Sequence, residues 1–263
     1  MSTTKKAWIN GLFLAVTLAI NTLGALGRIN GLSQKQISDM YLTLLTPSPS
    51  TFRIWSIIYL LLLASILVML IKNKIPYYQK AIRQLSLLFQ LSCVLNMAWI
   101  LAFSFVQIEL SVFFILGLAI TLALICKRLL QIQEAKRWLL PLSFGLYAGW
   151  LLIATLVNIA AALVKLNWNG FGLPDATWAA ITMIAAVLLV MEAQLHNRNA
   201  VFSLPVAWAY FGIYQFLKAP EGFGGQFGFL QIISLAGMVV LIGAAAIQLY
   251  RNHFSLLPAL HNN

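Results

Sequence analysis

Charged side chains are scarce in this sequence of 263 residues, of which only 9% are Asp, Glu, Lys or Arg. Soluble domains carry about 25% of these residues, so the shortage excludes an ordinary soluble protein. Six acidic residues and three histidines are scattered along the chain. We find neither a nucleophile beside a base nor paired carboxylates among them. Because acid–base and metal-assisted hydrolysis need such groups, we predict that the chain is not an enzyme.

Cysteine is also rare, since Cys93 and Cys126 are the two in the chain and both fall in or beside apolar runs. This excludes a disulfide framework and argues against a cysteine metal site. His253 and His261 have no third ligand nearby, which argues against zinc. The glycine-rich stretch 221–228 lacks the Lys-Ser/Thr pair of a phosphate-binding loop, so we interpret it as a flexible connection.

Apolar residues are abundant, at 61% of the chain, and they fall into long runs. About 20 such residues cross the hydrocarbon core of a bilayer as a helix. The sequence therefore predicts an all-α polytopic transmembrane bundle with about eight spans. The expected spans are 7–27, 52–71, 82–106, 110–125, 137–165, 177–193, 200–217 and 230–250. The basic start of the first run is also compatible with a signal peptide, but its length and the lack of a cleavage site favour a retained helix.

Basic residues favour one side of the predicted membrane. If the N-terminus is cytoplasmic, twelve of the 17 Lys and Arg residues fall in cytoplasmic segments, among them Lys136 and Arg137. The positive-inside rule then places both termini in the cytoplasm. The net charge of +11 is accounted for by topology and by contacts with anionic lipids, so we expect no nucleic-acid partner. A bacterial cytoplasmic membrane is the default location.

The span 137–165 has one polar and aromatic face. Tyr147, Trp150, Ala154 and Asn158 recur at spacings of three and four residues, which places them on one side of a helix. An amide deep in lipid is costly unless it is paired or faces the protein interior. This face should therefore look onto neighbouring helices or a ligand cavity.

Three stretches combine aromatic residues with proline or asparagine at defined spacings. They are Tyr41-x-x-Leu44-x-x-Pro47-x-Pro49 followed by Trp55-x-x-x-Tyr59, Gln90 with Leu95-Asn96-x-x-Trp99, and Tyr147-x-x-Trp150-x-x-x-Ala154-x-x-x-Asn158. In this order they resemble the tryptophan-rich sensory protein (TspO/MBR) family, which includes translocator protein, the peripheral benzodiazepine receptor. The resemblance covers residues 1 to about 165. It implies a TspO-like five-helix bundle over 1–170 and three additional helices with a short polar tail over 171–263.

The chain also departs from the family pattern. Pro47 and Pro49 are separated by Ser48, and the residue directly before Tyr147 is not a proline. The segment 156–165 has no tyrosine before its basic residue, so sterol binding through the family's cholesterol motif is not predicted.

The resemblance implies a cavity among the five helices, with the loop around 41–49 as its lid. Such a site suits a flat apolar ligand, because aromatic rings stack on it while amides hold its polar edge. The ligands implied are tetrapyrroles such as porphyrins and haem, for sensing, sequestration or transport, with no cofactor required. A homodimer is the implied assembly. The expected ligand-binding residues are Tyr41, Pro47, Trp55, Tyr59, Asn96, Trp99, Tyr147, Trp150, Ala154 and Asn158.

Other interpretations stay open at this stage. The same aromatic and amide residues are compatible with simple packing between helices, where an asparagine contributes about 0.6–2 kcal/mol. The chain is also compatible with a secondary transporter or with a membrane scaffold that binds no ligand. Arg53 is compatible with an ion pair to Asp39, with the binding of an anionic carboxylate, or with a lipid headgroup contact. Glu192 and His196 are four residues apart in the sequence. They are compatible with a proton-responsive pair, or with a glutamate that snorkels to the membrane surface beside a loop histidine.

Overall fold

The computed structural model describes residues 1–132 and 138–258, and within these ranges the regular structure is entirely helical. The α-helices are α1 (Thr3–Ala25), α2 (Gln34–Met40), α3 (Ile54–Ile71), α4 (Pro76–Ser104), α5 (Ile108–Gln131), α6 (Leu139–Lys165), α7 (Asp175–Asn197), α8 (Leu204–Lys218) and α9 (Gly228–Arg251). Two 3₁₀ helices, η1 (Pro49–Arg53) and η2 (Gly170–Gly172), lie between them. The prediction of an all-α fold is therefore confirmed for the described residues.

Local sequence signals explain where several helices begin. The Ser2 side chain accepts a hydrogen bond from the Lys5 amide and caps α1. Ser33 and Gln36 form a reciprocal capping box at the start of α2. Pro76 stands in the first turn of α4, where its missing N–H costs no hydrogen bond. Between such boundaries the chain is rich in Leu, Ile and Ala.

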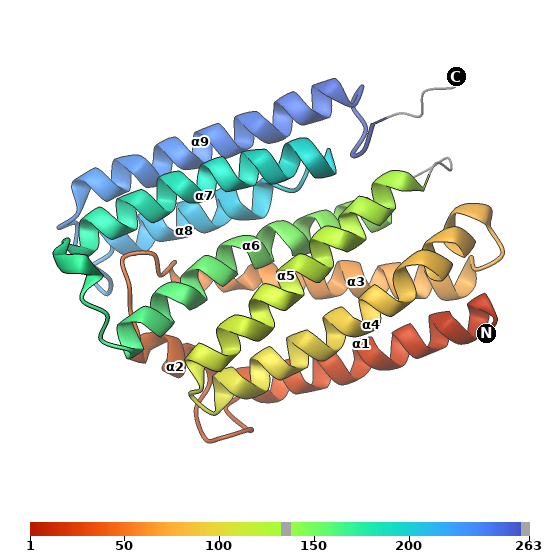
Figure 1. Ribbon diagram of the computed structural model, residues 1–263, viewed down its shortest axis with the longest axis horizontal. Helices are drawn as coiled ribbons and strands as arrows, with labels where there is room; N and C mark the ends of the chain where they lie inside the picture. The colour runs from red at the N-terminus through yellow and green to blue at the C-terminus, as the bar shows by residue number, and fades with distance from the viewer. Residues whose placement is uncertain (133–137, 259–263) are drawn as a thin grey trace.

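The long helices lie side by side and alternate in direction (Figure 1). Helices α1, α4, α6 and α8 run one way through the bundle, and α3, α5, α7 and α9 run the other way. The start of α1 and the end of α9 consequently lie at the same end of the molecule (Figure 1). Many outward side chains are large and apolar, for example Leu67, Leu87, Phe113, Ile232 and Ile247. A lipid environment accommodates this surface, whereas water does not.

Seven helices in the described residues are long and apolar enough to span a membrane. The exception among the eight predicted spans is the seventh, 200–217, which corresponds to the 15-residue helix α8. At 1.5 Å per residue α8 is about 22 Å long, less than the hydrocarbon thickness of about 30 Å. It nevertheless returns the chain along the bundle, because α7 and α9 run in the same direction (Figure 1). Which end faces the cytoplasm stays a prediction.

The last three helices pack against the first group through α6 and α8. The contact is close at Gly149, where an added Cβ would lie 2.0 Å from the Phe202 carbonyl oxygen. One helical turn away along α6, Gly145 leaves room for Asn199, whose Nδ2 donates to the Pro141 carbonyl at 2.8 Å. The predicted boundary at residue 170 therefore lies between two groups of helices that share a tight interface.

Candidate functional site

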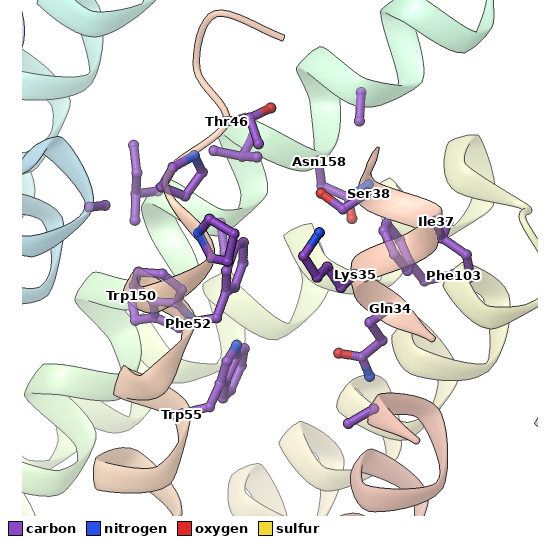
Figure 2. A pocket seen from close by; sticks show the side chains of 18 of the residues that line it. Gln34, Lys35, Ile37, Ser38, Thr46, Phe52, Trp55, Phe103, Trp150 and Asn158 are labelled. Carbon is purple, nitrogen blue, oxygen red and sulfur yellow. The ribbon is translucent and has the colours of Figure 1, made fainter. Parts of the chain in front are cut away.

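A cavity of about 450 Å³ lies at the end of the bundle where α1, α4, α6 and α8 terminate. Side chains from α1, α3, α4, α6 and α8 line it, and α2 and the segment 41–53 cover it. Figure 2 shows two opposed walls, with Phe52, Trp55 and Trp150 on one side and α2 on the other. This arrangement leaves a partly open space between an aromatic wall and a largely polar one.

Trp55 is the centre of the aromatic wall. Its ring stacks on Tyr59 at a centroid distance of 5.2 Å and on Trp99 at 5.9 Å. Trp150 meets the same ring edge-on at 6.2 Å and also meets Phe52 edge-on at 6.1 Å. Such aromatic pairs are fixed in orientation by their ring quadrupoles, so the wall is preorganised.

Amide groups that line the cavity are paired within the protein. Asn158 accepts a hydrogen bond from Trp99 Nε1 at 3.0 Å and donates to Ser111 Oγ at 2.9 Å. Asn21 accepts from the Tyr59 hydroxyl at 2.7 Å. These bonds hold the helices together and fix the rings that face the cavity. They also show that Asn158 serves helix packing, whatever further contact it makes.

Asn96 and Tyr147 extend this network away from the cavity. Asn96 accepts from Asn21 Nδ2 at 2.6 Å and donates to the Tyr147 hydroxyl at 3.0 Å. Both are buried and neither lines the cavity, although the Tyr147 ring lies edge-on to Trp55 at 6.0 Å. Eight of the ten predicted ligand-binding residues do line it, namely Tyr41, Pro47, Trp55, Tyr59, Trp99, Trp150, Ala154 and Asn158. Contact with a ligand stays a prediction for all ten.

Helix α8 completes the cavity and holds its cover. Ala209, Ile213 and Phe216 line the cavity from α8. In addition, three hydrogen bonds join α8 to the segment 48–51 of the cover. The Ser48 amide donates to the Gly212 carbonyl at 2.9 Å, the Ser48 hydroxyl donates to Gln215 Oε1 at 3.1 Å, and Trp208 Nε1 donates to the Thr51 carbonyl at 2.9 Å.

The sequence model of the TSPO-like protein family matches residues 7–247. The chain belongs to this family. The family predicted from the three motifs is thus confirmed, and the matched region includes α7, α8 and most of α9 as well as the first five long helices. Comparison with curated proteins and with solved structures gives no match. TSPO-like chains are generally non-enzymatic, multi-pass membrane proteins, and their helices imply a lipid bilayer as partner.

The TSPO-like chain has cavity residues that sequence analysis missed. Among them are the α8 residues and Gln34, Lys35 and Ser38 of α2. The capping-box pattern Ser33-x-x-Gln36 could have indicated the short helix α2 in the loop. No comparable signal linked α8 to the cover, because residues 48 and 215 are 167 positions apart in the chain.

Of the alternatives for Arg53, the ion pair with Asp39 is not formed in the described structure. Asp39 pairs with Lys35, one turn earlier on α2, because residues four apart on a helix are neighbours. Glu192 and His196 do lie together, with Nδ1 3.3 Å from the carboxylate, but both side chains are exposed. His261, Lys136 and Arg137 lie outside the described residues.

Proposed function

We propose that this TSPO-like protein binds a flat, largely apolar small molecule in the cavity, for sensing, sequestration or transport. The class of ligand we propose is a tetrapyrrole such as a porphyrin or haem. The observation that supports this proposal is the group of four aromatic residues formed by Trp55 and its neighbours Tyr59, Trp99 and Trp150, which line a cavity of about 450 Å³. Cavities that hold small molecules measure about 300–1,000 Å³ and are mainly apolar and aromatic.

An unsatisfied donor in the cavity wall favours binding over simple packing. Trp150 is 2% exposed, and its Nε1 has no acceptor among the residues that the structure describes. Buried polar groups nearly always have a partner, and one without it is costly. Because Nε1 is itself covered, a ligand acceptor satisfies it only if the side chains around Trp150 move on binding, whereas a packing role leaves the donor without a partner.

The experiment that tests the proposal is a titration of the purified protein with protoporphyrin, followed by the absorbance of its Soret band. We expect saturable binding that Trp150→Phe weakens about fivefold, since a net hydrogen bond contributes about 1 kcal/mol. The matched control is Trp8→Phe, because Trp8 is 66% exposed and lies on α1 far from the cavity. Equal affinities for the two variants would contradict a site at this wall.

We further propose that both termini are cytoplasmic, which places the cavity at the opposite end of the bundle. Cys93 and Cys126 are buried, so a membrane-impermeant thiol reagent should label introduced cysteines selectively. In right-side-out vesicles we expect labelling of Asn169→Cys and none of Ser2→Cys or Ser255→Cys until the membrane is opened. Labelling of Ser2→Cys in sealed vesicles would reverse the orientation.

A further inference from the structure

The α2 wall differs from the rest of the cavity in its chemistry. Lys35 and Asp39 are the charged residues among those that line the cavity in the described structure, and both lie on α2. Figure 2 shows the Lys35 side chain extending from α2 into the space between the two walls. The aromatic wall opposite has no charged group, so the cavity has one end suited to an apolar ring and one suited to an ionic group.

Three acceptor groups at the cavity already have partners within the protein. Asn158 Oδ1 accepts from Trp99, Asn21 Oδ1 accepts from Tyr59, and the Asp39 carboxylate is paired with Lys35. Trp150 Nε1 and Gln34 Nε2 also have no acceptor in the described part of the chain, but both atoms are buried, so the Lys35 ammonium group is the donor that extends into the open space. A ligand with an anionic edge therefore complements the Lys35 side of the cavity.

The Lys35–Asp39 pair is exchangeable. The two side chains are 62% and 45% exposed, and an exposed pair four apart on a helix contributes only about 0.3–0.5 kcal/mol. An anion arriving in the cavity can therefore replace Asp39 as the partner of Lys35 at little cost. Asp39 then acts as an internal competitor for the same ammonium group.

We infer that α2 forms a subsite for a carboxylate at the edge of the ligand, in which Lys35 exchanges Asp39 for the ligand's carboxylate. This inference rests on the proposed function and narrows it. The ligand is a planar apolar molecule with peripheral carboxylates, and its ionised form is preferred over its neutral ester. Lys35 raises the affinity for the ionised form, and Asp39 lowers it by competing for Lys35. The aromatic wall binds the ionised form and the ester alike.

The test compares protoporphyrin, which carries two carboxylates, with its dimethyl ester on the full-length protein. Lys35→Gln should weaken binding of the free acid about two- to fivefold, because an exposed ion pair contributes up to about 1 kcal/mol. Asp39→Asn should strengthen it by a similar factor, since the competing carboxylate is removed. Affinity for the ester should not change in either variant. Lys72→Gln, at the end of α3 and outside the cavity lining, is the charge-matched control.

The outcomes separate the inference from the proposed function. If both compounds bind saturably with equal affinity and neither α2 variant discriminates between them, the carboxylate subsite is overturned and the cavity proposal stands. If neither compound binds saturably to the unmodified protein, the proposed function fails. Because the two α2 variants shift acid binding in opposite directions, a loss of folding in either one cannot imitate the expected pattern.

Discussion

Ala154→Trp is expected to abolish ligand binding, with a loss of affinity of roughly a hundredfold or more. Ala154 lines the cavity from α6, between Trp150 and Asn158 on the same helical face. An indole at this position would occupy the space that faces the aromatic wall, and a rigid planar ligand cannot avoid it. Overpacking of a filled core costs about 1–3 kcal/mol, but here the new ring enters a cavity. Stability should therefore change little.

The measurement is protoporphyrin affinity together with thermal unfolding in the same detergent. Val164→Trp is the matched control, because Val164 is on the same helix, is 43% exposed and does not line the cavity. Tryptophan near a helix end is well tolerated at the membrane interface. Unchanged affinity in a folded Ala154→Trp protein would show that the ligand binds elsewhere.

Gly212→Ala is expected to detach the cover of the cavity from α8. A Cβ at this position would lie 2.0 Å from Thr51 Oγ1 and 2.9 Å from Thr51 Cβ. Thr51 is 1% exposed, so it has little room to move away. The helix and η1 must separate, which stretches the bond from the Ser48 amide to the Gly212 carbonyl. We expect a loss of about 1–3 kcal/mol in the free energy of unfolding and faster ligand release.

A double-mutant cycle assigns this effect to the contact between α8 and the cover. Thr51→Ala removes Oγ1 and Cγ2, which would lie 2.0 Å and 2.9 Å from the added Cβ, so it should recover part of the stability lost in Gly212→Ala. Gly243→Ala on α9 is the control, because an added Cβ there meets no atom within 4 Å. Additive effects of the Gly212 and Thr51 substitutions would contradict the predicted contact.

Much of the fold could be predicted from the sequence because membrane helices obey strong rules. Long apolar runs must form helices in lipid, where every backbone group needs a partner within its own segment. Trp150, Ala154 and Asn158 could be placed on one face because helical periodicity fixes their direction. The seventh predicted span, by contrast, had a weaker basis. Its helix α8 starts only at Leu204 and is 15 residues long.

The depth of each residue could not be predicted from periodicity. Tyr147 shares the helical face of Trp150, yet it lies behind the cavity, because the Trp55 ring closes the space beside it. Asn96 was predicted to line the cavity, but it lies outside the lining and its amide is paired with Asn21 and Tyr147. Whether an inward residue meets a ligand or another side chain depends on the packing of all neighbouring helices.

The wall contributed by α8 depends on contacts between distant parts of the chain. Trp208 bonds to Thr51 across 157 positions. A single sequence contains no periodic signal for such pairing, so the cavity was assigned to five helices alone. The structure adds α8 to them, and the family match over residues 7–247 includes it as well.

The most direct test of the cavity as a ligand site is the binding stoichiometry of protoporphyrin, measured by equilibrium dialysis against the detergent-purified protein. One cavity per chain predicts saturation at one molecule per chain, and the loss of this saturable component in Ala154→Trp. Uptake that rises linearly with concentration and is equal in both proteins would reflect partition into the micelle. That result would contradict the assignment of this cavity as the ligand site.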